Sequence, residues 1–303
     1  MNQLVILFIQ NILPIFLVAG AGYLTARYLQ VTPRSISIVS FYLFAPCLIF
    51  NLLTSSQLSG EDITRMAGFA AVTTLAVGGL TGLIGWRFHF ERRLLAAVLI
   101  TAMFGNAGNF GLSLILFSFN GETLAYASVF FITSAVLMYT VGVVIASLGK
   151  SSLQKAILGL FKVPTVYAVL LALIFNHFRW QLPLPLDRSI SLLADAAIPV
   201  LIVLMGVQLY SSKISNHKFA LILSNSMRLV ISPLIALGVS WLFHLKGAAF
   251  QAGMVEAAVP TAIATTVLAT EYDVEPAFVT TAVLISTLLS PLTLTPILAY
   301  LGA

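Results

Sequence analysis

The chain has 303 residues and a formal net charge of +5, and 59% of its residues are hydrophobic whereas only 8% are charged. This composition excludes a water-soluble globular domain and indicates an integral membrane protein. The basic residues are scattered in short loops, so the positive charge does not indicate a nucleic-acid partner. Cys47 is the only cysteine, which excludes a disulfide and a cysteine-based metal cluster, and no cofactor is expected.

Long apolar segments follow one another along the whole chain. Most hold about 20 residues or more, which is enough for a helix to cross a hydrocarbon core of ~30 Å. The first segment lacks the basic region and the cleavage site of a signal peptide, so we expect it to remain as a spanning helix. The ten expected spans are Leu4–Leu29, Ser35–Leu53, Thr64–Trp86, Leu94–Phe119, Thr123–Leu148, Leu153–Phe175, Ser189–Tyr210, Phe219–Phe243, Ala248–Thr270 and Ala277–Leu301.

The basic residues between the spans predict the orientation. The loops after odd-numbered spans hold ten of them: Arg27, Arg34, Arg87, Arg92, Arg93, Lys150, Lys155, Lys162, Lys213 and Lys218. The termini and the other loops hold four: Arg65, Arg179, Arg188 and Lys246. Because cytoplasmic loops are enriched in Lys and Arg, we expect both termini on the outer side of the inner (plasma) membrane.

The middle of the fourth span is rich in residues that disfavour a continuous helix. Five of them fall within seven positions: Gly105, Asn106, Gly108, Asn109 and Gly111. Unpaired backbone groups are costly in hydrocarbon, so a break at this depth is tolerated only where it lines a cavity or is buried in protein. We expect two half-helices with Asn109 near the start of the second, forming a binding site. The alternative is close helix packing at the glycines, with the asparagines joining neighbouring helices.

The two halves of the chain resemble each other. Three matches recur at nearly one offset: Pro14 with Pro164, Pro46 with Pro199, and Asn106 with Val259 beside Pro260. Residues 1–149 and 150–303 would each hold five spans, and because five is odd the halves must have opposite topology. Such an inverted repeat is typical of secondary transporters. Chance remains the alternative, because proline is common in membrane helices.

Span nine is expected to break at Pro260, which removes a helical hydrogen bond. If broken spans four and nine cross, their half-helix N-termini bring positive partial charge to one point, which suits a carboxylate. Asn106, Asn109 and Thr261 would be its neutral hydrogen-bond donors, beside Gly108. The alternative is that Pro260 only kinks span nine for packing.

Three ionisable residues lie well inside spans: Asp195, Arg228 and Glu256. Buried charge in a membrane is expensive and indicates function by default. Glu256 precedes Pro260 by one turn, which makes it a candidate for proton coupling, and Arg228 is a candidate for substrate or gate electrostatics. The structural alternative is an Arg–carboxylate pair that holds helices together.

Several motifs resemble the auxin efflux carrier family. They are Gly-Asn-Ala-Gly-Asn-Phe-Gly at 105–111, Phe-Asn-Gly-Glu at 119–122, the stretch 197–206 and the stretches 259–262 and 284–290. The resemblance implies a fold shared with bile-acid and sodium/proton antiporter-type carriers. Spans 1, 2, 6 and 7 would form a scaffold, and spans 3–5 and 8–10 a transport domain.

The resemblance also implies where the substrate binds. The crossing asparagines of the family map onto Asn106 and Asn109, and its crossing proline onto Pro260. Bacterial members are described as transporters of malonate, malate or other carboxylates, and plant members export auxin. This chain has Thr261, Thr265 and Thr266 where the plant proteins place asparagine, so the substrate does not carry over.

Together these features predict an all-α membrane protein with broken crossing helices four and nine. We expect a homodimer in the lipid bilayer that transports a small organic anion by an elevator-like movement, with coupling to protons or sodium left open. An anion channel and a carboxylate sensor that does not transport are the rival interpretations. The chain contains none of the common hydrolase, zinc-protease or nucleotide-binding motifs, so an enzyme is not expected.

The orientation is testable with introduced cysteines. In a Cys47→Ala background, cysteines at Lys155 and Lys218 should react with a membrane-impermeant thiol reagent only after permeabilisation, because both loops are expected in the cytoplasm. Labelling of intact cells at these sites would reverse the predicted topology.

Overall fold

The structure is a computed structural model that describes residues 3–55, 58–147, 164–210 and 215–303. Within these ranges every extended regular element is a helix, and the only strand-like feature is an isolated β-bridge between Gly105 and Thr261. The all-helical class is therefore confirmed. Four of the basic residues used for the orientation lie outside the described residues, as do the expected end of span five and start of span six: Lys150, Lys155, Lys162, Lys213, Leu148 and Leu153.

The first half contains these elements, in which η marks a π-helical turn: α1 (Gln3–Leu7), η1 (Phe8–Ile12), α2 (Leu13–Leu29), α3 (Pro33–Val39), η2 (Ser40–Phe44), α4 (Ala45–Ser55), α5 (Gly60–Arg87), α6 (Arg92–Met103), η3 (Ala107–Gly111), α7 (Leu112–Ser118), α8 (Gly121–Leu137), η4 (Met138–Gly142) and α9 (Val143–Ala146). The second half contains α11 (Pro164–Phe178), α12 (Leu184–Tyr210), α13 (Lys218–Ser226), η5 (Met227–Ile231), α14 (Ser232–Leu242), α15 (Gly247–Ala258), α16 (Ala264–Glu271) and α17 (Pro276–Leu301).

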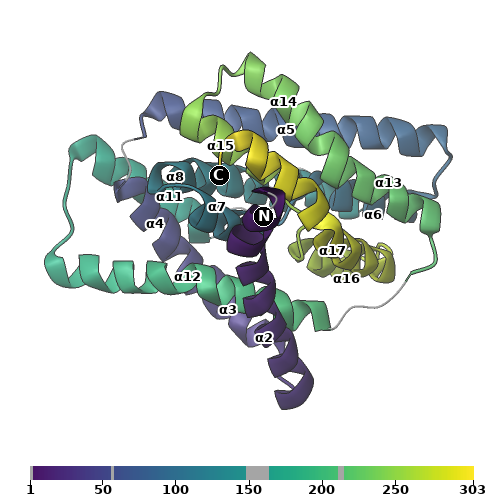
Figure 1. Ribbon diagram of the computed structural model, residues 1–303, viewed down its shortest axis with the longest axis horizontal. Coiled ribbons are helices and arrows are strands. Elements are labelled where there is room, and N and C mark those ends of the chain that lie inside the picture. The colour runs from purple at the N-terminus through teal and green to yellow at the C-terminus, as the bar shows by residue number, and fades with distance from the viewer. Residues whose placement is uncertain (1–2, 56–57, 148–163, 211–214) are drawn as a thin grey trace.

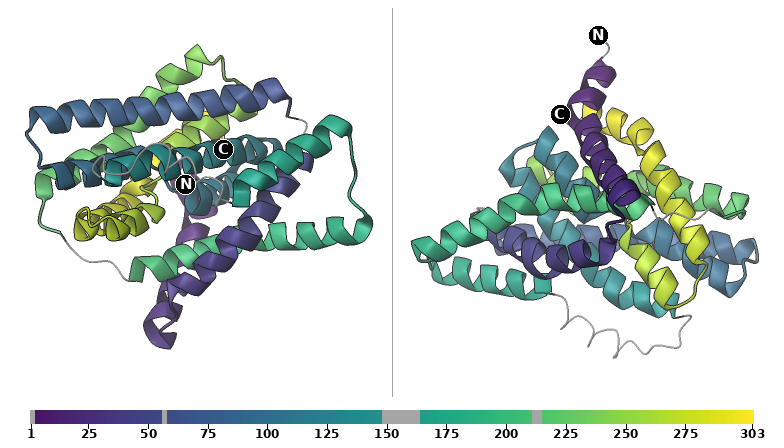
Figure 2. Two further views of the ribbon diagram at one scale, coloured as in Figure 1. Left: turned by 180° about the vertical axis from the view of Figure 1, so that it is seen from behind. Right: turned by 90° about the horizontal axis from the view of Figure 1, so that it is seen from below.

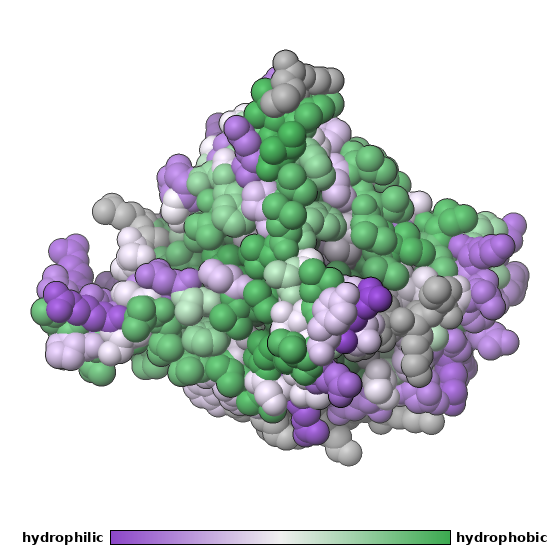
Figure 3. Space-filling view, turned by 60° about the horizontal axis from the view of Figure 1, so that its bottom comes forward, coloured by the Kyte–Doolittle hydropathy of each residue, from purple (hydrophilic) through white to green (hydrophobic). Residues whose placement is uncertain are grey.

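Seven of the described helical segments are long and apolar enough to cross a membrane, and two shorter apolar helices cover Ala107–Ser118 and Pro164–Phe178. Many large apolar side chains, such as Leu17, Leu192 and Leu292, lie exposed on the outside of these helices. Figure 3 shows apolar residues covering most of one face, with hydrophilic residues gathered toward its left and right margins. Such a surface is suited to lipid and not to water.

Three of the π-helical turns have a common local cause. η1, η2 and η5 end two residues before Pro14, Pro46 and Pro233, respectively. Proline has no N–H to donate, and its ring clashes with the carbonyl four residues earlier, so the preceding turn widens to accommodate it. The prolines thus shape the spanning helices without ending them.

The helices pack as two groups (Figures 1 and 2). In the first group, α12 packs against α2 and α4, and α4 packs against α11. In the second group, α5 and α15 pack against each other and each packs against α8 and α14, and α6 packs against α5 and α13. The second group also contains two interruptions, the short non-helical stretches between the end of α6 and the start of η3 and between the end of α15 and the start of α16.

The first group is held by an unusually close helix contact. A Cβ atom at Gly22 of α2 would lie 2.2 Å from the Val203 carbonyl oxygen of α12, and one at Gly206 would lie 1.8 Å from the Ala19 oxygen. Only glycine lets these backbones approach so closely. Small residues are the usual means by which membrane helices pack tightly, because lipid supplies no hydrophobic drive between them.

We therefore expect Gly206→Ala to separate α2 from α12 and to destabilise the protein by about 1–3 kcal/mol or more, because overpacking cannot relax against backbone atoms. The measurement is the thermal unfolding midpoint in detergent. Gly20→Ala is the matched control, because nothing lies within 4 Å of a Cβ at that position of α2. Equal midpoints for the two variants would contradict this account of the contact.

Candidate functional site

The two interruptions meet and pair with each other. The Asn106 N–H donates to the Pro260 carbonyl oxygen at 2.7 Å, and the Ala262 N–H donates to the Phe104 oxygen at 2.8 Å. These two bonds form a short antiparallel bridge centred on Gly105 and Thr261. The two bonds satisfy four of the backbone groups that the interruptions free from their helices, which lowers the cost of breaking a helix inside the protein.

Arg228 binds the ends of both interrupted helices. Its guanidinium donates through Nη1 to the Met103 oxygen at 3.1 Å, in the last turn of α6, and through Nη2 to the Ala257 oxygen, in the last turn of α15. The side chain of Arg228 is only 3% exposed. Helix C-termini carry negative partial charge, so this buried cation is stabilised by two of them. A Cβ at Gly105 would lie 2.9 Å from Val259 Cγ2 and 3.2 Å from the Arg228 Cζ, so both side chains leave little room for a larger residue there.

The opposite ends of the interruptions remain open. Among the described residues, the backbone N–H groups of Ala107, Gly108 and Asn109 at the start of η3 have no hydrogen-bond acceptor, and neither has that of Ala264 at the start of α16. These helix starts carry positive partial charge. The four residues line one cavity of about 320 Å³, so the residues that carry these unpaired donors border a space that a ligand can occupy.

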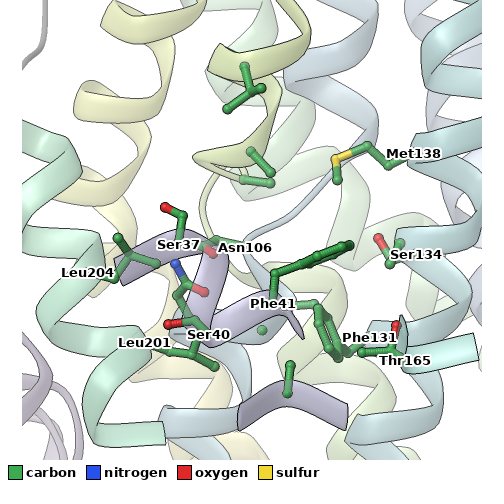
Figure 4. Close-up of a pocket in the computed structure, with 18 of the residues that line it drawn as sticks. Ser37, Ser40, Phe41, Asn106, Phe131, Ser134, Met138, Thr165, Leu201 and Leu204 are labelled. Carbon is green, nitrogen blue, oxygen red and sulfur yellow. The ribbon is translucent and has the colours of Figure 1, made fainter. Parts of the chain in front are cut away.

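The cavity lies between the two helix groups, and π-helical turns form much of its wall (Figure 4). η2 contributes Ser40, Phe41 and Tyr42, η3 contributes its first three residues, and η4 contributes Met138 and Tyr139. π-Helical turns occur frequently at functional sites. Among the lining residues that the structure describes, none is charged; the polar ones are Ser37, Ser40, Tyr42, Asn106, Asn109, Ser134, Tyr139, Thr165 and Gln208.

The residues predicted for the site fall into two sets. Asn106, Gly108 and Asn109 line the cavity. The Asn109 side chain forms no hydrogen bond with any described residue, whereas Asn106 Nδ2 lies 3.6 Å from the sulfur of Met205. Pro260 and Thr261 do not line the cavity. They belong to the bridge itself, and the Thr261 hydroxyl donates to the Thr101 carbonyl at 2.9 Å.

The three ionisable residues are not gathered at one point. Glu256 is fully buried, and both its carboxyl oxygens lack a hydrogen-bond partner in the described part of the chain. The carboxyl group packs against Gly111, where a Cβ would lie 2.3 Å from Oε2. No ion pair within 4.0 Å joins it to Arg228 among the described residues. Asp195 is exposed on the outside of α12.

Residues of spans two, five and seven also line the cavity, and sequence reasoning did not identify them. Phe41, Phe131 and Gln208 are examples. One available signal was Gln208, a polar side chain near the end of an apolar span. Another was Pro46, because the turn before a proline widens and redirects the side chains of η2.

Comparison with known proteins identifies the family. A family model described as "Membrane transport protein" matches residues 7–155 and 148–298. An "Uncharacterized transporter" of Methanothermobacter thermautotrophicus is 29% identical over 252 residues, which cover 81% of each chain.

Two further relatives have names that mention a cargo. A "Putative malonate transporter" of Rhizobium meliloti is 28% identical over 309 residues, which cover 95% of this chain and 93% of the relative. Auxin efflux carrier component 3a of Oryza sativa subsp. japonica is 33% identical over 142 residues, 45% of this chain and 23% of that protein. The chain therefore belongs to the membrane transport protein family that includes the auxin efflux carriers.

Proposed function

We propose that this protein is a secondary active transporter of a small organic anion that carries a carboxylate. The observation that carries the proposal is the cavity between the helix groups, which two helix N-termini and the amides of Asn106 and Asn109 face. Carboxylates bind well at helix N-termini. The names of the relatives from Rhizobium meliloti and Oryza sativa, a malonate transporter and an auxin efflux carrier, support a carboxylate cargo.

Neutral donors are suited to an anion that must also be released. Each helix start supplies about half an elementary charge, and an amide N–H adds a hydrogen bond without a full opposite charge. The cation Arg228 is held by carbonyl oxygens behind the crossing. We propose that it holds the crossing together and that it does not contact the substrate.

The arrangement proposed for transport has ten spans in two inverted halves, 1–149 and 150–303. Spans 1, 2, 6 and 7 would be the scaffold, and spans 3–5 and 8–10, with the crossing of spans four and nine, would move past it as an elevator. The packing of α2, α4, α11 and α12 as one group and of α5, α8, α14 and α15 as another supports this division. We further propose a homodimer in the inner (plasma) membrane with both termini outside.

Coupling to protons is proposed to act through Glu256. An ionised carboxylate without hydrogen-bond partners is very costly inside a membrane protein. We therefore propose that Glu256 is protonated in this conformation. If movement of the crossing exposed Glu256 to water, the group would lose its proton there. Proton transfer would then accompany each transport cycle.

The carboxylate site is tested by Asn109→Asp. The substitution keeps the size of the side chain and replaces amide donors by a negative charge, so a bound anion would lose one hydrogen bond and meet repulsion. A charge-assisted hydrogen bond contributes roughly 1.5–3 kcal/mol, which corresponds to about a 10–150-fold loss of affinity. Binding and uptake are measured in proteoliposomes with a panel of monocarboxylates and dicarboxylates.

Asn106→Asp should have a similar effect on binding. Ser113→Ala is the control, because that hydroxyl donates to the Asn109 carbonyl oxygen and does not line the cavity. If Asn109→Asp protein transported an organic anion normally, the start of η3 would not be the anion site.

Proton coupling is tested by Glu256→Gln, which mimics the protonated side chain. We expect uptake driven by a pH gradient to be lost, while substrate binding and exchange without a gradient remain. A variant that folds and keeps the pH dependence of the wild type would rule out this coupling role and leave Glu256 as a packing residue against Gly111.

A further inference from the structure

A second set of polar groups lies on the wall of the cavity formed by spans two and seven. The Ser40 hydroxyl oxygen is buried in a residue only 2% exposed and has no hydrogen-bond partner among the described residues. The Gln208 Oε1 is likewise buried and without a partner, and its Nε2 donates to the Ser37 hydroxyl at 3.4 Å. All three side chains line the cavity.

Such groups require an explanation, because a buried polar atom without a partner destabilises the folded protein. These are not remote from the candidate site. In the view of Figure 4, Ser37 and Ser40 lie on the same side of the cavity as Asn106, while Phe131, Ser134 and Thr165 lie on the other. The Ser40 and Gln208 oxygens themselves are closed off from the cavity, but because both residues line it, rotation of these side chains to another rotamer would bring their polar groups to a ligand there.

The chemistry of this wall indicates which ligand group it suits. A serine hydroxyl and a glutamine amide each both donate and accept hydrogen bonds, as does a hydroxyl group on a ligand. A second carboxylate would need compensation of its charge, and none of the described residues that line the cavity is cationic. The rest of the surface near these groups is apolar, with Phe41, Leu201 and Leu204 among the lining residues.

We propose that Ser40 and Gln208 form a second subsite that binds an uncharged hydrogen-bonding group of the substrate, so that the preferred class is a hydroxylated monocarboxylate and not a dicarboxylate. This inference rests on the proposed function, which places the carboxylate at Asn109 and the start of η3.

The subsite also ties substrate recognition to one state of the transporter. Ser40 and Gln208 belong to the proposed scaffold, whereas Asn106 and Asn109 belong to the proposed moving domain. A hydroxylated acid would bridge the two, and an elevator movement would separate its two contacts. Such a substrate stabilises the state shown here relative to the other by its extra contact.

The test uses acids that differ only at the far end. Valerate, 4-hydroxybutyrate and glutarate carry a methyl, a hydroxyl and a carboxylate group, respectively, at the end of the same three-methylene chain. Two further sets, one with one methylene fewer and one with one methylene more, vary the distance between this group and the first carboxylate. Binding to the purified full-length protein is measured by titration calorimetry. We expect the hydroxy acid of at least one set to bind roughly 2–10-fold more tightly than its methyl and carboxylate counterparts.

Two substitutions test whether the preference for the hydroxy acid comes from Ser40 and Gln208. Ser40→Ala and Gln208→Met should each bring the affinity ratio of hydroxy acid to methyl acid close to one without weakening the methyl acid. Ser134→Ala, which removes the same chemical group from the opposite wall, should leave the ratio unchanged. Unfolding midpoints for each variant establish that it is folded.

The outcomes separate this inference from the proposed function. If methyl and hydroxy acids bind equally, if a dicarboxylate binds most tightly, or if the ratio survives in both variants, the second subsite is refuted while the carboxylate site stands. If no acid of any set binds the wild-type protein, the carboxylate site is refuted and the second subsite with it.

Discussion

The structure depends on how backbone groups are satisfied where α6 and α15 end inside the protein. A peptide that leaves its helix away from water exposes donors and acceptors that are costly to leave unpaired. Here the two interruptions satisfy four of these groups for each other, through the bonds from Asn106 to Pro260 and from Ala262 to Phe104, and several of the donors that remain are at residues that line the cavity. Each break depends on the other for these bonds. The two paired interruptions, called the crossing here, therefore form a single cooperative unit from residues more than 150 positions apart in sequence.

The same crossing separates charge by sign. The C-terminal ends of α6 and α15 contact the Arg228 guanidinium, whereas the starts of η3 and α16 face the cavity. The full positive charge of Arg228 is thus used inside the protein, and the described residues bring partial positive charges alone to the space that a ligand would enter. A cavity with neutral walls can admit an anion without holding it as tightly as an arginine would.

The sequence predicts local features, such as where a helix ends, far better than it predicts which distant residues contact each other. Hydropathy located the long apolar helices, and the glycines and asparagines of 105–111 together with Pro260 marked positions where regular helix ends in the structure. Neither hydropathy nor these motifs could predict that the Thr261 hydroxyl donates to the Thr101 carbonyl oxygen, or that Arg228 donates to backbone carbonyl oxygens. Such contacts are decided by which segments meet in three dimensions, and one sequence contains no record of that. The walls from η2 and α12 were missed for the same reason.

The π-helical turns around the cavity have a consequence for how this site changes in evolution. A π-helical turn holds one residue more than an α-helical turn and completes almost the same rotation about the axis. Deleting one residue within η2 would therefore restore a regular α-helix and leave the direction of α4 nearly unchanged, while the residues that remain in the turn would point in new directions. Ser40, Phe41 and Tyr42 would then no longer line the cavity as they do now. The length of span two, and not only its composition, therefore sets which groups face the cavity, so insertions and deletions can alter substrate choice as effectively as substitutions.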